Sequence, residues 1–313
     1  MKKNGIKQIA EKAGCSCATV SRVLNGRPGI SEDVRKKIFE IATEVDYANS
    51  RKKRIIALLV YLDNDGFDDY SMHLLRLMVQ KLRRAGFYVE VLFDENYEIL
   101  EERYVSGIIS INIYGNIAER LGYKIKLPMV CVNDFDNLPE DIHAVYSDDR
   151  QAITEAVDYL VSCGHKSIYL MGVKTKNNMN NSRRIQAFMQ YTDQLGMQDS
   201  CGVIFCRGRF VSSISCEKYV KQLPADCTAV ISTIESVGAA LYRTLQKTRP
   251  DVTLLSWQYT WDKAFDNIKI PSMQQNFRKL VDYSVEMLIN QLDGKRVYNQ
   301  AVPYIFKKYR KKI

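Results

Sequence analysis

The sequence has no long hydrophobic run. Its longest apolar stretch, IIALLVYL at residues 55–62, has eight residues, whereas a membrane-spanning helix needs about 20. The N-terminal MKKNG has none of the apolar segment that a signal peptide carries. We therefore expect no membrane partner and no export, and we predict a cytoplasmic protein.

Histidine is scarce, and the cysteines show no metal-binding spacing. The chain has three histidines and eight cysteines. Cys15 and Cys17 are separated by one residue and Cys201 and Cys206 by four, and neither pair has a matching second pair. Without an export signal, we expect free thiols in a reducing compartment. We predict no metal and no cofactor.

Catalytic motifs are also missing. The sequence has no phosphate-binding GxxxxGK loop, no GxGxxG after a strand, no GxSxG and no HExxH. Asp148 and Asp149 form a carboxylate pair, but adjacent residues at the end of a strand point to opposite sides. We therefore predict that the protein is not an enzyme.

What is present is a basic head on a nearly neutral body. The 313 residues carry a net charge of +9, and residues 1–54 account for a surplus of seven basic residues, which leaves two for the rest. A short basic segment of this kind indicates contact with a polyanion. The alternative is a solvated charged surface.

Residues 1–46 are predicted to form three short helices that pack as one bundle. The first is IKQIAEKAG, which ends at Gly14, and the second begins after Ser16. Ser31 is expected to cap the third helix. The inward-facing residues of the second helix are Val20, Val23 and Leu24, and those of the third are Val34, Ile38, Ile41 and Val45.

Two helices joined by a glycine turn, with a polar outer face on the second, indicate a helix-turn-helix that binds DNA. Arg22 is suited to a bidentate contact with guanine, and Cys17 and Ala18 offer small surfaces to a thymine methyl. The short polar candidates for phosphate are Ser16, Thr19, Ser21 and Asn25, and Ser31 and Arg51 complete the DNA-binding set. The alternative is a helical bundle that does not bind DNA.

After residue 54, apolar strands alternate with helical segments, which predicts an α/β fold with parallel sheets. Two such series predict two doubly wound lobes. The expected strands lie at 55–62, 87–93, 105–112, 129–134, 144–149, 167–173, 202–206, 228–233 and 253–257, and the expected helices at 72–86, 150–163, 182–195 and 236–247.

The head resembles that of the LacI/GalR family of bacterial transcription regulators. The similarity lies in IKQIAEKAGCSCATVSRVLNG and ISEDVRKKIFEIATEVDY, and it runs without a gap from Ile6 to Tyr47. It implies that Cys17, Ala18 and Arg22 select the operator bases.

The hinge at 47–54 departs from the family pattern. The family usually has Tyr-x-Pro-Asn and then a helix whose leucine enters the minor groove, whereas this chain has YANSRKKR. The basic residues 51–54 either follow the phosphate backbone or form a flexible, solvated linker.

The body is similar to the family's core, which resembles periplasmic sugar-binding proteins, and the similarity is carried by YSDDRQAITEAVDYLVSCGHKSIYLMG. It implies a core at 55–313 that binds an effector and dimerises. Lobe one is expected at about 55–148 and 277–301, and lobe two at about 149–276 and 302–313. The short segment 94–110, the irregular hinge and Ala187 resemble the branch that represses β-galactosidase and galactose operons.

The effector cleft is expected between the lobes, at the carboxyl ends of strands. The resemblance implies that Arg184 holds hydroxyls or a carboxylate, and ordinary core packing remains the alternative for Phe67 and Phe277. Ile234, Glu235 and Gln258 stand where the family usually has Asn, Asp and Asp. The candidate effector contacts are Asp63, Phe67, Asn133, Arg184, Phe210, Glu235, Gln258 and Phe277.

The sequence therefore predicts a homodimeric repressor of a carbohydrate-utilisation operon, bound to a near-palindromic operator. With Arg184 facing a wall that includes Trp257, the expected effector is a phosphorylated sugar, a glycoside or an organic acid. The alternatives are a regulator that responds to no effector and a soluble sugar-binding module.

Overall fold

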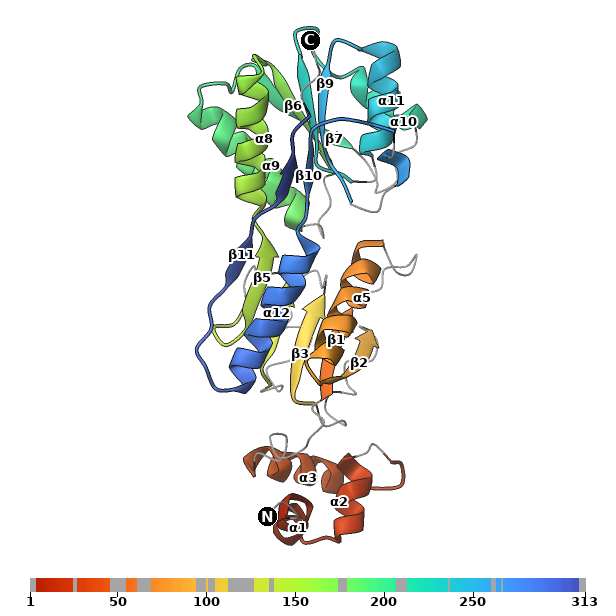
Figure 1. Ribbon diagram of the computed structural model, residues 1–313, viewed down its shortest axis with the longest axis vertical. Coiled ribbons are helices and arrows are strands. Elements are labelled where there is room, and N and C mark those ends of the chain that lie inside the picture. The colour runs from red at the N-terminus through yellow and green to blue at the C-terminus, as the bar shows by residue number, and fades with distance from the viewer. Residues whose placement is uncertain are drawn as a thin grey trace. The chain divides into compact units, whose positions relative to one another are not determined.

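The computed structural model describes most of the chain (Figure 1). The described residues are 4–24, 27–45, 55–60, 69–93, 100, 105–111, 127–134, 138–173, 179–206, 213–235, 237–259, 263–265 and 267–309. None of the helices within these residues is long and apolar enough to cross a membrane.

The head is a three-helix bundle, as predicted. Its helices are α1 (Asn4–Ala13), α2 (Cys17–Leu24) and α3 (Glu32–Glu44). They share one core, to which α1 contributes Ile9, α2 contributes Val20 and Val23, and α3 contributes Ile38. The prediction that Val34 is buried is wrong: it is 36% exposed, because it lies in the first turn of α3, at the edge of the bundle.

Serines precede two of the head helices, but only one makes a side-chain cap. Ser16 Oγ accepts a hydrogen bond of 3.0 Å from Thr19 N, which satisfies one of the free amides at the start of α2. Ser31 occupies the equivalent position before α3 and makes no side-chain cap hydrogen bond. Ser31 therefore occupies the predicted N-cap position, but its side chain does not make the hydrogen bond of a cap.

The chain divides into two compact units, and each is described separately. One comprises 1–146 and 277–300, and the other 147–276 and 301–313. The sequence analysis predicted that the chain passes from one lobe to the other after residues 148, 276 and 301. Apart from the head, each unit is built on a six-stranded sheet, and the strand orders are β11-β5-β4-β3-β1-β2 and β12-β10-β9-β8-β6-β7. In both, the first strand lies between the second and the third, so the two units repeat one doubly wound topology.

In unit 1 a parallel sheet carries α5 and α12 on one face. β1 pairs in parallel with β2 and β3, β3 with β4, and β4 with β5. α5 packs against α12, and both contact the sheet. The elements are β1 (Ile55–Val60), α5 (Asp69–Arg84), β2 (Tyr88–Phe93), β3 (Gly107–Ile111), β4 (Met129–Val132), β5 (His143–Ser147), α12 (Phe277–Leu292) and β11 (Gln300–Val302), the strand in which the chain passes to unit 2.

In unit 2 helices cover both faces of the sheet (Figure 1). Alternate residues of one strand enter different cores: Ile168 and Leu170 pack with α8 and α9, whereas Met171 packs with α10 and α11. The elements are α8 (Asp149–Ser162), β6 (Ile168–Val173), α9 (Met179–Gln194), β7 (Cys201–Cys206), α10 (Ser213–Val220), β8 (Ala229–Ser232), α11 (Gly238–Thr248), β9 (Thr253–Trp257), a 3-10 turn (Lys263–Phe265), β10 (Ser272–Gln274) and β12 (Ile305–Lys307).

These elements confirm the predicted α/β class, and they include six that the sequence did not predict: α10, α12, β10, β11, β12 and the 3-10 turn at Lys263–Phe265. The prediction that Asp148 and Asp149 end a strand is wrong. β5 ends at Ser147, and Asp148 caps α8 by accepting a hydrogen bond of 3.0 Å from Gln151 N.

Candidate functional site

The outer face of α2 carries most of the residues predicted to bind DNA. Cys17, Ala18 and Arg22 are exposed, whereas Thr19 and Ser21 are half-buried. Asn25 and Arg51 lie outside the described residues, as does the whole hinge at 47–54. The exposed basic side chains of the head are Lys7, Lys12, Arg22, Arg27, Lys36 and Lys37.

The polar side chains of Ser16, Thr19 and Arg22 already have partners within the head. The Ser16 and Thr19 hydroxyls are 2.9 Å apart, and Ser16 Oγ is committed to the α2 cap. Arg22 Nη2 donates a hydrogen bond of 3.0 Å to the Pro28 carbonyl. The position of Arg22 is therefore set by the loop before α3, a contact that the sequence analysis did not predict.

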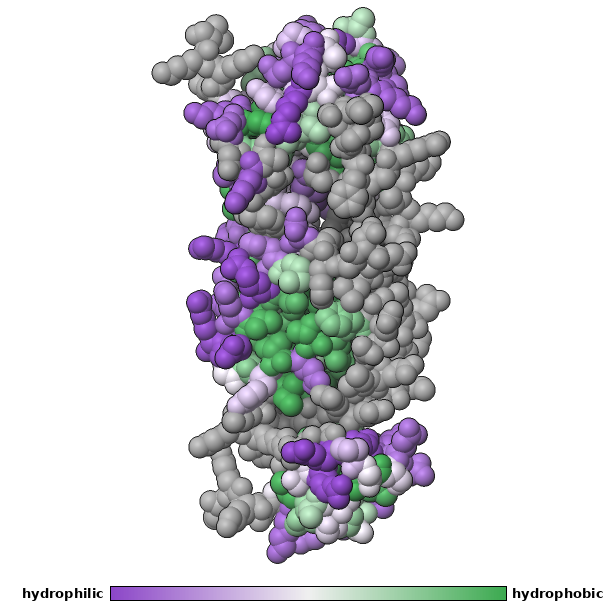
Figure 2. Space-filling view, turned by 90° about the vertical axis from the view of Figure 1, so that its right-hand side faces the viewer, coloured by the Kyte–Doolittle hydropathy of each residue, from purple (hydrophilic) through white to green (hydrophobic). Residues whose placement is uncertain are grey.

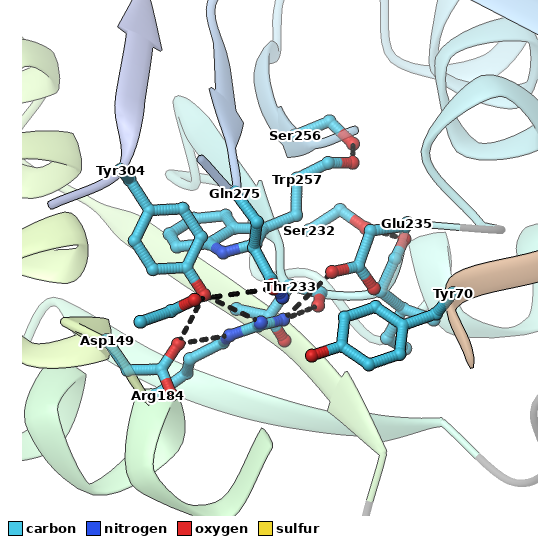
Figure 3. Close-up of polar contacts among 12 residues, drawn as sticks. Tyr70, Asp149, Arg184, Ser232, Thr233, Glu235, Ser256, Trp257, Gln275 and Tyr304 are labelled. Carbon is cyan, nitrogen blue, oxygen red and sulfur yellow. Dashed lines mark hydrogen bonds and ion pairs between the residues drawn. The ribbon is translucent and has the colours of Figure 1, made fainter. Parts of the chain in front are cut away.

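In unit 2 the predicted effector contact Arg184 lies at the centre of a buried network (Figure 3). Its side chain is 4% exposed. Arg184 Nε donates to Asp149 Oδ1 at 2.8 Å, and Nη1 donates to Thr233 O at 2.8 Å. Nη1 also donates to Glu235 Oε1 at 3.3 Å, and Nη2 donates to Tyr304 Oη at 2.9 Å.

Tyr304 closes the network as a neutral phenol. Its hydroxyl donates to Asp149 Oδ1 at 2.6 Å while it accepts from Arg184. Burial raises the pKa of Tyr304 well above its ordinary value, Asp149 raises it further and Arg184 opposes the rise. For Arg184, burial acts to lower the pKa, but Tyr304, Asp149 and Glu235 together raise it well above its ordinary value. The guanidinium therefore stays charged.

The network leaves Arg184 little capacity to hold an anionic ligand. Two carboxylates, Asp149 and Glu235, lie within 3.3 Å of its guanidinium nitrogens. Four of its five N–H donors are used by protein acceptors. An added anion would find one remaining N–H donor, could make a second hydrogen bond only by displacing an acceptor, and would meet the carboxylates at close range, which costs free energy in a buried site.

The prediction that Trp257 lines a ligand site opposite Arg184 is wrong. Trp257 is 0% exposed, and its ring centroid lies 5.4 Å from the guanidinium carbon of Arg184. The ring centroid of Tyr304 lies 5.8 Å from the same guanidinium carbon. Trp257 is therefore part of the core on which Arg184 rests, because residue 257 is the last of β9 and points to the face covered by α8 and α9.

Gln258 has a polar group that could bind a ligand, whereas Ile234 has only an apolar side chain. Gln258 is buried, and within the described part of the chain its Nε2 has no hydrogen-bond acceptor. Ile234 packs against the core under α10 and α11. Gln258 follows β9 and Glu235 follows β8, so both lie at the carboxyl ends of parallel strands, where doubly wound sheets bind ligands.

In unit 1 the predicted contacts Asn133 and Phe277 are both buried. Asn133 follows β4 with a φ of 58°, a left-handed conformation that asparagine tolerates, and its amide donates to the Tyr70 hydroxyl. The Phe277 ring centroid lies 5.5 Å from that of Tyr70 and 5.2 Å from that of His73. Burial, followed by the charge of Arg76, lowers the pKa of His73. These contacts agree with ordinary core packing of Phe277.

Asp63, Phe67 and Phe210 lie outside the described residues. Within the residues that are described, no group of three or more His, Cys, Asp and Glu is placed to hold a metal ion. Tyr304 and Asp149 are site residues that the sequence analysis missed. The acidic pair at 148–149 was visible, but nothing local indicated which arginine it would meet.

Two family descriptions match the chain. Residues 5–50 match "Bacterial regulatory proteins, lacI family". Residues 53–249 match "Periplasmic binding proteins and sugar binding domain of LacI family".

Curated relatives are similar over part of their length. The HTH-type transcriptional regulator GanR of Bacillus subtilis is 33% identical over 222 residues, which is 66% of this chain and 65% of the relative. The uncharacterized HTH-type transcriptional regulator YkvZ of the same organism is 28% identical over 212 residues, or 61% and 62%. The chain thus spans less than two thirds of these relatives.

Solved structures share the fold over nearly the whole chain. The lac repressor dimer bound to operator and an anti-inducer has a TM-score of 0.67 at 18% identity, over 96% of both chains. The transcriptional regulator CelR in complex with cellobiose has a TM-score of 0.65 at 17% identity, over 97% of this chain and 98% of that one.

Proposed function

This chain belongs to the lacI family of bacterial regulatory proteins, and on that premise we propose that it is a sequence-specific DNA-binding regulator of transcription. The proposed role is repression of a carbohydrate-utilisation operon in the cytoplasm. The observation that carries the proposal is the exposed face of α2, with Cys17, Ala18 and Arg22 together on a basic three-helix head. This surface is suited to major-groove contact with base edges.

A second copy of the chain is proposed to complete the binding unit. Along α5 the exposed Met72 and the half-buried Leu75 and Val79 form a stripe, next to β2, an edge strand that begins with the exposed Tyr88. Figure 2 shows hydrophobic surface gathered on this side of unit 1. A contiguous apolar patch beside a strand edge supports a homodimer contact. Two heads would then bind two half-sites of a near-palindromic operator.

The proposed effector is a neutral, hydroxyl-bearing molecule such as a glycoside. Support comes from the carboxyl ends of the unit 2 strands, where Glu235 offers an acceptor and Gln258 Nε2 is a buried donor. The carboxylates around Arg184 disfavour the phosphorylated sugars and organic acids that the sequence alone suggested. CelR, a structural relative with cellobiose bound, supports the same ligand class.

One observation favours a second candidate, a regulator that responds to no effector. The acceptors that hold Arg184 come from the chain itself, and Asp149 and Glu235 neutralise its charge without a ligand. A soluble sugar-binding module is disfavoured, because it would not need a basic head with an exposed helix-turn-helix. Within the family, the short segment 94–110 and Ala187 support a place in the β-galactosidase and galactose operon branch.

Selection from a randomised duplex library tests the proposal. The full-length protein should enrich one near-palindromic sequence, and its affinity should fall steeply as salt rises, because phosphate contacts release counterions. Arg22→Ala should weaken binding to the enriched duplex by about 1–3 kcal/mol and binding to random DNA much less. Equal losses on both DNAs would make Arg22 a phosphate contact, and failure to enrich any sequence would contradict the proposed function.

A further inference from the structure

The loop before α3 holds the exposed side chain of Arg22 in place. Arg22 Nη2 donates to the Pro28 carbonyl at 3.0 Å. A β-carbon built on the next residue, Gly29, would lie 3.5 Å from the same nitrogen. The guanidinium of Arg22 therefore lies against a stretch of backbone that carries no side chain at Gly29.

The loop itself is tied to both neighbouring helices. Arg27 N donates to Arg22 O at 2.9 Å, which fixes the loop to the end of α2. Arg35 Nη2 in α3 donates to Arg27 O at 3.2 Å. With hydrogen bonds at both ends, the Pro28 carbonyl has a defined position relative to α2.

An arginine held in this way differs from an ordinary exposed arginine. A free arginine side chain samples many rotamers, and ordering it on binding costs affinity. Guanidinium has five N–H donors in one plane, and the Pro28 carbonyl accepts from one of them. Donors remain for a bidentate contact, and the plane that contains them is already oriented.

We propose that the Pro28 carbonyl and Gly29 position Arg22 as a preformed reader of guanine in the major groove. The inference rests on the proposed DNA-binding function, and it adds that the loop backbone orients the guanidinium that selects the base. Gly29 is suited to this role because its φ of 90° is a conformation that residues with a side chain rarely adopt. A β-carbon there would make only ordinary van der Waals contact with Arg22 Nη2, at 3.5 Å, so a substitution acts on the Pro28 carbonyl through strain in the loop backbone. Pro28 and Gly29 are positioning residues, and Arg22 is the group that contacts DNA.

The test is Gly29→Ala in the full-length protein, measured on the duplex that the wild type selects. The position read by Arg22 is first identified as the base pair at which Arg22→Ala loses its preference for guanine. At that pair, Gly29→Ala should reduce the guanine preference about fivefold, the loss expected when one long side chain is no longer ordered in advance. Preferences at the other base pairs should not change.

A double-mutant cycle separates positioning from a general effect on the fold. If Gly29 acts through Arg22, then Gly29→Ala should leave base preferences unchanged in a protein that already carries Arg22→Ala. Gly14→Ala is the matched control. Gly14 lies in the same head with a φ of 71°, and nothing lies within 4 Å of an added β-carbon. This control should lower the stability of the head and keep the guanine preference.

A measurement without DNA keeps the inference testable if Gly29→Ala does not fold. Nitrogen-15 relaxation of arginine side chains in the wild type should show a restricted Arg22 and a mobile Arg27, which is also exposed. Equal mobility of the two would overturn the inference. So would a uniform loss of affinity at all base pairs, or an unchanged guanine preference, in Gly29→Ala. A wild type that selects no sequence would contradict the proposed function itself and remove the basis of the inference.

Discussion

At the scale of the residue, two arginines show how surroundings assign different roles to one side chain. Arg22 is exposed and has one backbone acceptor, so most of its donors remain available. Arg184 is buried among two carboxylates, a carbonyl and a phenol. Removing Arg184 would leave Asp149 as a buried charge without its cation, which is strongly destabilising.

We therefore expect Arg184→Ala to lower the free energy of unfolding of unit 2 by about 3–5 kcal/mol. Both tryptophans of the chain belong to unit 2, so tryptophan fluorescence in a urea titration reports on it. Arg243→Ala is the control, because Arg243 is an exposed arginine of α11, and it should change the same free energy by less than about 0.5 kcal/mol. Similar losses in the two variants would show that the network contributes little stability.

At the scale of the element, the two serines that precede head helices provide a direct comparison. Ser16 Oγ accepts from an α2 amide, whereas Ser31 makes no side-chain cap bond. Ser16→Ala should therefore destabilise the head by about 1 kcal/mol, and Ser31→Ala by less. Hydrogen exchange of head amides in the full-length protein measures both changes. If Ser31→Ala had the larger effect, the assignment of the caps would be wrong.

The helices of the core also show what a local pattern can specify. α5 runs to Arg84 and is followed by Gly86 with a φ of 87°, so its end was readable from one glycine. α12 and the three-residue strands β10 and β12 were not predicted. Strands this short carry almost no periodic signal, and their pairing depends on segments far away in the sequence.

At the scale of the whole molecule, the apolar stripe of α5 predicts the state of assembly. Met72 is 43% exposed, and in a dimer it would be covered by the partner. Met72→Glu would bury a charge in that interface and should convert dimers to monomers in sedimentation velocity. Met189→Glu alters a methionine that is 58% exposed on α9 of unit 2 and should leave the dimer intact. A monomeric wild type would contradict the proposed dimer, and a dimer lost through Met189→Glu alone would place the contact elsewhere.

The sequence by itself determined the class of the protein. The helices of the head, the alternation of strands and helices, and the exposed Arg22 and buried Val20 of α2 all follow from residue spacing of 3.6 or 2 along one segment. Local capping and turn residues add the boundaries. The resemblance of the head to a family rests on the same short-range pattern.

Only the tertiary structure decided what the charged and aromatic residues do. Arg184 lies 35 residues from Asp149 and 120 from Tyr304 along the chain, and Trp257 joins these three from a fourth segment, β9. No local sequence pattern specifies that these four side chains come into contact. Their contact depends on the order of the strands in the sheet and on which side chains lie at the same end of the sheet. Similarly, the acceptor that holds Arg22 is a backbone carbonyl, a group present at every residue. Its role comes from its position in the folded head and leaves no distinctive pattern in the sequence.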